Sequence, residues 1–282
     1  RGAPAAGALT VLVTGGAGQL GRALRAELPD AEFGELPELD ITDRAALAAR
    51  DWSRTTAIVN TAAWTAVDAA EHDILAAWDV NATGVAELAS HARRLGVPFV
   101  HVSTDYVLAG EHRGDAPADA PLDPRGMYGV GKAAGELAAR IAPQHYVVRT
   151  SWMFGDGPNF IRTVRRLAEQ RQQLTVVDDQ IGRPTYAVDL ARALVRLLAS
   201  DLPPGTYHAT GSGEPVSWAG LAAIALQGTG CTVVPVTTAQ YARDAPGTAP
   251  RPANSGLTAG ALVLREWREA LAEYLEAERA RA

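Results

Sequence analysis

A tyrosine and a lysine stand four residues apart in the segment MYGVGKAAGELAARI, residues 127–141. Side chains at i and i+4 of a helix lie one above the other, so Tyr128 and Lys132 are expected on the same face. A phenol with a pKa near ~10 is a poor acid at neutral pH unless its anion is stabilised. A lysine ammonium nearby would lower the pKa of Tyr128 and make it a proton donor.

A hydroxyl that could orient a reacting oxygen precedes this helix. VHVSTDYV places Ser103, Thr104 and Asp105 at the end of a predicted strand, where doubly wound sheets have their ligand crevice. Taken singly, Tyr128 is interpreted as a surface aromatic, Lys132 as a solvated charge and Thr104 as a strand-end cap. Their order in the chain, after a glycine turn, favours carbonyl chemistry instead.

The glycine turn is a GxxGxxG pattern made by Gly15, Gly18 and Gly21 between a predicted strand and a predicted helix. Its glycines permit a tight turn, a close backbone approach to a pyrophosphate, and close helix–strand packing. The pattern predicts a dinucleotide site, and a bound nicotinamide would help to lower the pKa of Tyr128. Gly129 and Gly131, each costing about 1 kcal/mol inside a helix, would let helix and cofactor approach closely.

The residues about 20 positions beyond such a turn indicate which dinucleotide binds, since an acid holds the ribose 2′-OH and arginine a 2′-phosphate. Three glutamates (Glu32, Glu35, Glu38) occupy this stretch, and no Arg or Lys lies between Arg25 and Arg44. NADH is therefore slightly favoured over NADPH. Asp40 is expected beside the adenine. Alternatively, Asp40 caps the N-terminus of the next helix, a role that Thr42 or Asp43 could also fill.

The order of elements predicts an α/β fold. Apolar, strand-like runs lie within residues 9–28, 55–64, 97–110 and 144–155, and helical periodicity extends over 74–96 and 127–141. This alternation predicts a Rossmann-type doubly wound parallel sheet. We predict a dinucleotide-binding domain at 1–155, with 175–200 returning to it, and a smaller C-terminal α+β substrate-binding lobe over 156–282.

Composition excludes several classes of protein. The 282 residues carry 26 basic and 32 acidic side chains, a net charge of −6, without a basic run that would suit nucleic acid. One cysteine, Cys231, and six histidines without HxH or HExxH spacing predict no metal site of these kinds. No run approaches a membrane span, and the opening residues, a lead-in to the first strand, lack a signal-peptide core. A cytoplasmic protein is expected.

Nine motifs together resemble the dTDP-4-dehydrorhamnose reductases of the extended short-chain dehydrogenase/reductase superfamily. They are TGGAGQLG, LDITD, VNTAAWTAVDAAE, VSTDYVLAG, YGVGKAAGE, RTSWMFG, VVDDQIGRPTYAVDLA, YHATGSG and RPANSGL. The later motifs are more specific than the glycines or YxxxK. The resemblance implies reduction of the C4 ketone of a dTDP-4-dehydro-6-deoxy-L-hexose by NADH or NADPH, most simply dTDP-4-dehydro-L-rhamnose to dTDP-L-rhamnose.

The resemblance also implies roles for individual residues. Tyr128 would donate the proton, with Lys132 as its electrostatic partner and Thr104 orienting the oxygen. The implied cofactor contacts are Gly15, Gly18, Gln19, Leu20, Gly21, Asp40, Ile41, Ala62, Ala63, Trp64, Thr65, Tyr128 and Lys132. The implied substrate contacts are Thr104, Asp105, Tyr128 and Trp152, whose indole could pack on the deoxysugar or simply belong to the core. The helix expected within 159–173 carries a cluster of arginines that forms either a solvated face or an attraction for the substrate's diphosphate: Arg162, Arg165, Arg166 and Arg171. Arg183 and Arg251, in motif-matched loops, are the alternative anchors.

Departures from the family pattern leave alternatives open. Leu36 and Pro37 stand where the family often has a basic residue, which puts NADPH use in doubt. Leu108 and Ala109 replace the usual Phe-Asp beside the sugar site, so the substrate could be another dTDP-keto-sugar, such as the dihydrostreptose precursor. A non-catalytic, cofactor-binding regulatory subunit is a third interpretation. Magnesium and a homodimer occur in the family and are left open here without assigned residues.

Overall fold

Parallel strands form the centre of the larger lobe in the computed structural model, which describes residues 9–245 and 247–281. Their spatial order across the sheet is β10-β5-β4-β3-β1-β2, and every neighbouring pair is parallel. The strands are β1 (Thr10–Thr14), β2 (Glu32–Gly34), β3 (Thr55–Asn60), β4 (Phe99–Thr104), β5 (His145–Thr150) and β10 (Gly205–His208). The order in which successive strands join the sheet reverses between β1 and β3, and such sheets form a ligand crevice at this point.

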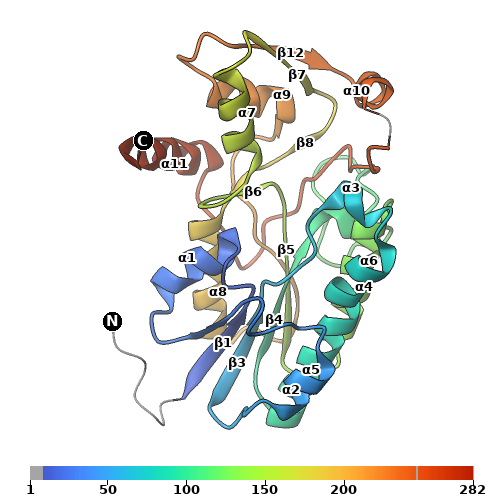
Figure 1. Ribbon diagram of the computed structural model, residues 1–282, viewed down its shortest axis with the longest axis vertical. Helices are drawn as coiled ribbons and strands as arrows, with labels where there is room; N and C mark the ends of the chain where they lie inside the picture. The colour runs from blue at the N-terminus through green and yellow to red at the C-terminus, as the bar shows by residue number, and fades with distance from the viewer. Residues whose placement is uncertain (1–8, 246, 282) are drawn as a thin grey trace.

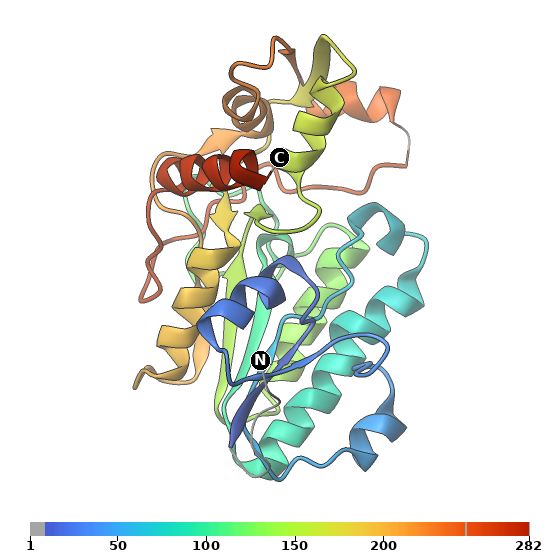
Figure 2. The same ribbon diagram turned by 60° about the vertical axis from the view of Figure 1, so that its left-hand side comes forward.

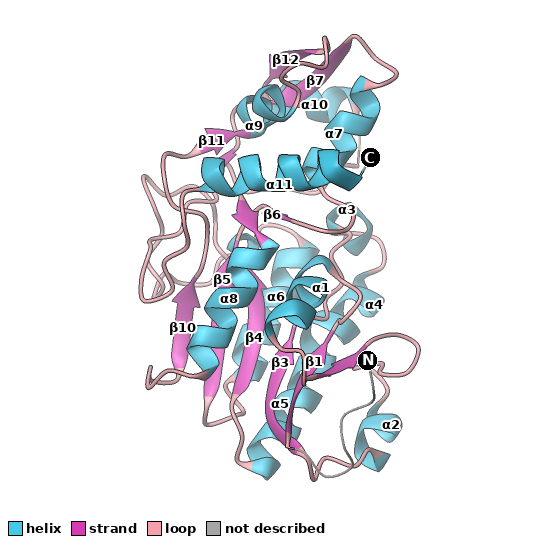
Figure 3. Ribbon diagram, turned by 90° about the vertical axis from the view of Figure 1, so that its left-hand side faces the viewer, coloured by secondary structure: helices cyan, strands magenta, loops and turns pink. Residues whose placement is uncertain are grey.

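Helices cover both faces of this sheet, as its apolar strands require (Figures 1 and 3). On one face, α1 (Gln19–Glu27) and α8 (Ala187–Leu198) pack through Leu24 and Leu194. On the other face, α2 (Arg44–Ala49), α5 (Gly84–Leu95) and α6 (Met127–Ala139) pack through Leu47, Leu88 and Ala139. The predicted Rossmann-type doubly wound fold is confirmed.

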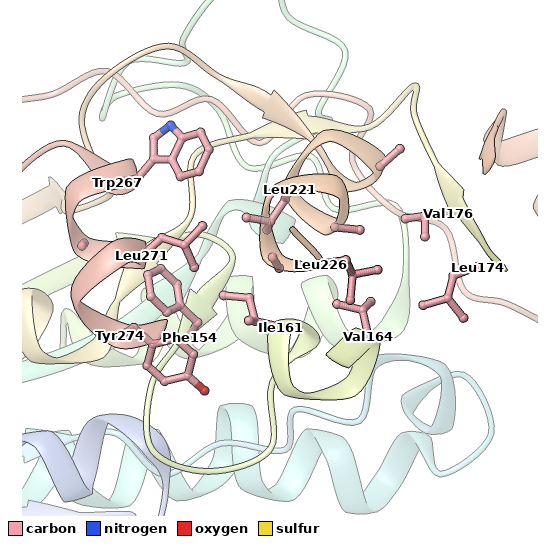
Figure 4. Close-up of a cluster of buried hydrophobic side chains, with 14 residues drawn as sticks. Phe154, Ile161, Val164, Leu174, Val176, Leu221, Leu226, Trp267, Leu271 and Tyr274 are labelled. Carbon is pink, nitrogen blue, oxygen red and sulfur yellow. The ribbon is translucent and has the colours of Figure 1, made fainter. Parts of the chain in front are cut away.

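A smaller lobe stands at the carboxyl ends of the strands (Figure 2). It contains α7 (Phe160–Ala168), β7 (Gln173–Val177), α9 (Trp218–Ala225), β12 (Thr232–Val236) and α10 (Thr238–Asp244), with β7 and β12 parallel. Figure 4 shows its core, where Trp267, Leu271 and Tyr274 of α11 (Trp267–Arg281) meet side chains of α7 and α9. Four short strands form two further pairs: β6 (Met153–Phe154) with β9 (Thr185–Tyr186), and β8 (Ile181–Gly182) with β11 (Val216–Ser217).

Three local features differ from the expectations or add to them. The helix expected over 74–96 is divided into α4 (Ile74–Trp78), a π-helical turn η1 (Asp79–Thr83) and α5, after the short helix α3 (Val67–Ala70). Strand β2, only three residues long, was too short for its pattern to reveal. Strand β10 and helix α8 lie with the large sheet, while the proposed domain boundaries themselves stay a prediction. The expected lead-in at residues 1–8 lies outside the described residues.

Within the described part of the chain, every helix is too short or too polar to cross a lipid bilayer.

Candidate active site

The glycine turn between β1 and α1 is built as its spacing predicts. Gly15 adopts a φ of +73°, and a Cβ there would lie 2.6 Å from the backbone nitrogen of Ala62. A Cβ on Gly21 would lie 2.3 Å from the Gly15 carbonyl oxygen. Gly18 caps α1 without a side-chain hydrogen bond, which leaves the first N–H groups of the helix available. A diphosphate fits this turn, since helix N-termini bind anions through such groups.

The loop after β3 faces this turn and is fixed by a buried asparagine. Asn81, fully buried in η1, accepts the Trp64 N–H (2.9 Å) and donates to the Trp64 carbonyl (3.1 Å). The predicted cofactor residues Ala62, Ala63, Trp64 and Thr65 therefore lie in a loop of defined conformation beside Gly15. The sequence did not reveal this task for Asn81, because it depends on the π-helical turn, a feature common at functional sites.

The acidic residue Asp40 forms a local turn, since its Oδ1 accepts the Thr42 N–H and hydroxyl at 2.8 and 2.7 Å. Asp43 is the residue that caps α2, by accepting the Ala46 N–H. Ile41 is buried against Gly84, whose hypothetical Cβ would lie 2.8 Å from Ile41 Cγ1. Asp40 is thus free of the capping task and remains a candidate for the adenine contact.

Thr104, Asp105 and Tyr128 come together at the carboxyl end of β4. Thr104 Oγ1 donates to Asp105 Oδ1 (3.0 Å) and accepts the Tyr106 N–H (3.3 Å). Desolvation raises the pKa of Tyr128 to about 12, and the neighbouring Thr104 side chain opposes this rise. Burial raises the pKa of the Asp105 carboxyl to about 6 against the hydrogen bond from Thr104, and Asp105 Oδ2 is buried without a hydrogen-bond partner. The site therefore holds a protonated phenol beside a carboxyl group that titrates near neutrality.

Lys132 lies one turn beyond Tyr128 on α6, 2 % exposed, with Nζ donating to the Val102 carbonyl (2.7 Å). Burial lowers the pKa of Lys132 to about 8. Lys132 is also the only lysine in the sequence, which otherwise uses arginine for every cationic side chain. Lysine, unlike arginine, can change its protonation state when buried. A chemical use of this ammonium explains its presence better than surface charge does.

Helix α6 is held against the sheet by groups distant in sequence. Glu136, fully buried, accepts two bonds of 2.8 Å from Arg149 of β5 and one of 2.6 Å from Ser103 of β4. Glu71 accepts the Met127 N–H (2.7 Å) and so caps the helix. These contacts fix the height of Tyr128 and Lys132 above the sheet.

The glycines of α6 have a different task from the one expected. A Cβ on Gly129 would lie 2.3 Å from the Tyr106 carbonyl oxygen, and one on Gly131 would lie 3.2 Å from Asn81 Cβ. The space beside both glycines is therefore filled by protein, and they let α6 approach η2 (Asp105–Val107) and η1 rather than the cofactor.

Trp152 links the two lobes beside this site. Its φ of +48° is the one positive value among the described non-glycine residues, a strained conformation that is common at functional sites. Its indole stacks on Trp218 at 3.6 Å between ring centroids and donates from Nε1 to Ser255 (3.1 Å). One face of the ring is thus covered, so only the remaining surface could contact a sugar.

The two arginines considered as diphosphate anchors are both ion-paired. Arg183 donates to Asp115 (2.8 Å), and Arg251 donates to both carboxylate oxygens of Asp68 (2.9 and 3.0 Å). Among the described residues, no three His, Cys, Asp or Glu side chains lie close enough together to bind a metal ion.

The end of β2 is contacted by a cation of α1 that the spacing did not reveal. Arg25 reaches back from α1, stacks over Phe33 (4.4 Å to the ring centroid) and pairs with Glu35 (3.3 Å). Its Nη2 lies 3.0 Å from the position of a Cβ on Gly16, within the glycine turn. An acid and a base therefore both stand where the adenosine ribose of a dinucleotide would lie.

Comparison with known proteins places this chain in a family. The model of the RmlD substrate binding domain matches residues 9–280. The chain belongs to this family. It is 40% identical, over 95% of its length and 92% of the relative's, to a dTDP-4-dehydrorhamnose reductase of Mycobacterium tuberculosis. It is 42% identical, over 75% of both chains, to a dTDP-4-keto-6-deoxy-D-glucose reductase of Streptomyces niveus.

A solved structure supports the same assignment. The dTDP-4-dehydrorhamnose reductase of Bacillus anthracis, crystallised in complex with NADP, superimposes with a TM-score of 0.88 at 30% identity and covers 96% of this chain and 99% of its own. The resemblance to the dTDP-4-dehydrorhamnose reductase family is confirmed, as is the prediction of an oxidoreductase of this type.

Proposed function

We propose that this protein reduces the C4 ketone of a dTDP-4-dehydro-6-deoxy-L-hexose. The proposed substrate is dTDP-4-dehydro-L-rhamnose, and the product is dTDP-L-rhamnose. The observation that carries the proposal is the position of Thr104, at the carboxyl end of β4, beside the buried Tyr128 of α6, which is one helical turn from the buried Lys132. The names of the related reductases support a dTDP-linked keto-sugar as substrate.

The residues present fit a nicotinamide dinucleotide. The N–H groups at the start of α1 would bind its diphosphate, Gly18, Gln19 and Leu20 would line it, and Asp40 with Ile41 would border the adenine. Gln19 supports this reading, because its Oε1 is buried without a hydrogen-bond partner. Ala62, Ala63, Trp64 and Thr65 would form the wall next to the nicotinamide.

The side chains then have distinct tasks. When bound, the reduced nicotinamide supplies a hydride to C4. Thr104 holds the ketone oxygen, and Tyr128 transfers its phenolic proton to that oxygen as negative charge develops there. The ammonium of Lys132 stabilises the phenolate that remains, since an opposite charge nearby favours the ionised form. Asp105 would accept a hydrogen bond from a sugar hydroxyl, and Trp152 would contact the ring through its uncovered surface.

A second substrate has a specific observation in its favour. Leu108, 3% exposed, packs with Val107 and Leu257 in an apolar cluster directly after the site. An aliphatic side chain at this position would change the shape of the sugar pocket, so another dTDP-keto-sugar, such as the dihydrostreptose precursor, is the alternative.

Both NADH and NADPH are proposed to bind, with NADH favoured. Glu35 would accept a hydrogen bond from the ribose 2′-OH, whereas Arg25 would pair with a 2′-phosphate if released from Glu35. The NADP complex of the Bacillus anthracis relative supports use of the phosphorylated form in the family. Magnesium stays without assigned residues in this proposal.

A homodimer and a cytoplasmic location complete the proposal. Ile74, Leu75 and Trp78 of α4 expose apolar side chains on one short helix, with Leu75 80% exposed. Such a group is typical of a surface that another chain covers. Sedimentation of the purified protein tests the oligomeric state.

Cofactor consumption tests the reaction itself. The purified protein is supplied with dTDP-4-dehydro-6-deoxy-D-glucose, with or without the 3,5-epimerase that converts it to the L-sugar, and with NADH or NADPH. Oxidation only with the epimerase supports the rhamnose proposal. Oxidation without epimerase indicates a D-sugar reductase. Cofactor binding without oxidation in any arm favours the regulatory subunit.

A further inference from the structure

A chain of buried polar groups connects the glycine turn to Lys132. Thr14 Oγ1 donates to Asn60 Oδ1 (2.6 Å), Asn60 Nδ2 lies 3.0 Å from His101 Nδ1, and His101 Nε2 lies 3.4 Å from Lys132 Nζ. Thr14, Asn60 and His101 are fully buried, and a Cβ on Gly135 would lie 3.2 Å from His101 Nε2. The reduction mechanism above gives His101 no task.

The donors and acceptors of this chain determine the tautomer of His101. The Ala62 N–H can only donate, and it points to Asn60 Oδ1 at 3.2 Å, so this atom must be the amide oxygen. The amide NH₂ of Asn60 therefore faces His101 Nδ1, which must accept. Burial and the charge of Lys132 hold the pKa of His101 well below its ordinary value, so the ring is neutral. Its single proton is then on Nε2, facing Lys132.

An N–H group in this position has opposite effects on the two forms of Lys132. It is repelled by an ammonium, which has no lone pair, and it can donate to a neutral amine, which has one. The amine could at the same time donate to the Val102 carbonyl, 2.7 Å away. The arrangement is fully satisfied only when Lys132 has lost a proton.

We propose that His101, fixed as the Nε2–H tautomer by Asn60, is a positioning residue that favours the uncharged form of Lys132. It thereby sets the pH above which Lys132 no longer stabilises a Tyr128 phenolate, a consequence that rests on the proposed function. The relation between His101 and Lys132 itself does not depend on the substrate.

The other ionisable groups around Lys132 belong to its own helix or are already neutralised. Glu136, one turn further along α6, favours the ammonium, although its carboxylate is paired with Arg149 of β5 and bonded to Ser103. Tyr128 lies one turn earlier on α6, protonated at neutral pH. His101, on β4, is the group that disfavours the charged form of Lys132.

The single lysine makes this proposal directly measurable. In the full chain grown with ¹³C,¹⁵N-lysine, one side-chain signal reports Lys132, and its chemical shift against pH gives the titration midpoint. Histidine labelled with ¹⁵N shows which ring nitrogen of His101 carries the proton; the signal is assigned by its loss in His101→Phe or, if that variant does not fold, from the backbone of residue 101. Neither measurement needs a substrate, so failure here is distinct from failure of the proposed reaction.

The expected result is a proton on Nε2 of His101 and a Lys132 midpoint at pH 8 or below. Asn60→Asp places an acceptor next to Nδ1, which moves the ring proton there and lets Nε2 accept from the ammonium. It should raise the Lys132 midpoint by at least about one pH unit, and by less than half as much in the His101→Phe background. A proton on Nδ1 in the wild-type protein, or equal effects of Asn60→Asp in both backgrounds, would overturn the proposal.

Discussion

Replacing Asp105 by asparagine should make the protein more stable at neutral pH. Burial raises the pKa of this carboxyl from 3.8 to about 6, so the folded state resists its ionisation. A group with a raised folded-state pKa contributes stability that is present below the unfolded pKa and lost as pH rises through the folded value. The ionised Asp105 therefore destabilises the fold above about pH 6.

The size of this effect follows from the shift. About two pKa units, at 1.36 kcal/mol each, give about 3 kcal/mol as the upper limit of the gain from Asp105→Asn. The amide oxygen can keep the bond from the Thr104 hydroxyl, now 3.0 Å long, and its NH₂ replaces Oδ2, which is buried without a hydrogen-bond partner. Allowing for imperfect geometry, we expect a gain of about 2 kcal/mol at pH 7.5, or about 5 °C in Tm.

Urea unfolding of both proteins at pH 7.5 and pH 4 is the appropriate assay. The difference in unfolding free energy should be close to its full size at pH 7.5 and small at pH 4, where wild-type Asp105 is protonated. Asp73→Asn is the matched control, because that exposed carboxyl makes no capping hydrogen bond, and it should change stability by less than about 0.5 kcal/mol. A gain of equal size at both pH values, or a loss at pH 7.5, would refute the reasoning.

Three further substitutions test other parts of the site. Glu136→Gln leaves Arg149 buried without its carboxylate and should cost about 3–5 kcal/mol of unfolding free energy, measured by urea denaturation. Gly21→Ala forces a methyl group onto the Gly15 carbonyl oxygen and should weaken dinucleotide binding, measured by NADH fluorescence, by at least about tenfold. Glu35→Gln removes the partner of Arg25 and should move the ratio of kcat/KM values toward NADPH by about tenfold.

The first two have a control in the same chain. Arg192→Met breaks the partly exposed pair with Glu27 and should cost less than about 1 kcal/mol. Gly205→Ala adds a Cβ with no atom within 4 Å and should leave dinucleotide binding unchanged. Unchanged stability in the Glu136 variant, unchanged binding in the Gly21 variant, or an unchanged cofactor ratio in the Glu35 variant would contradict the corresponding assignment.

The parts of the site that the sequence predicted are those encoded by short spacing. The glycine turn depends on three residues within seven, and the alignment of Tyr128 with Lys132 depends on one helical turn. The fold class follows from alternating apolar runs, each visible on its own. These features needed no knowledge of which distant segments meet.

The features that the sequence did not reveal depend on partners from other elements. Asn60 and His101 are 41 residues apart, and His101 and Lys132 are 31 apart. Arg25 belongs to α1 and reaches Phe33 and Glu35 through its side chain, so a search limited to the residues about 20 positions beyond the turn passed over it. The α6 glycines were predicted to contact the cofactor, because nothing in their spacing shows that Tyr106 and Asn81 lie beside them.

The central claim is that Tyr128 donates the proton in keto-sugar reduction, and Tyr128→Phe tests it most directly. Tyr106→Phe is the matched control, since its ring packs edge-on against that of Tyr128, with 5.3 Å between the ring centroids. For both variants, cofactor affinity and steady-state turnover of the epimerised dTDP-4-keto-sugar would be measured. We predict that Tyr128→Phe binds NADH within a few-fold of wild type and loses at least about 100-fold in kcat, while Tyr106→Phe keeps most of its turnover. Turnover near the wild-type value in Tyr128→Phe would contradict the account.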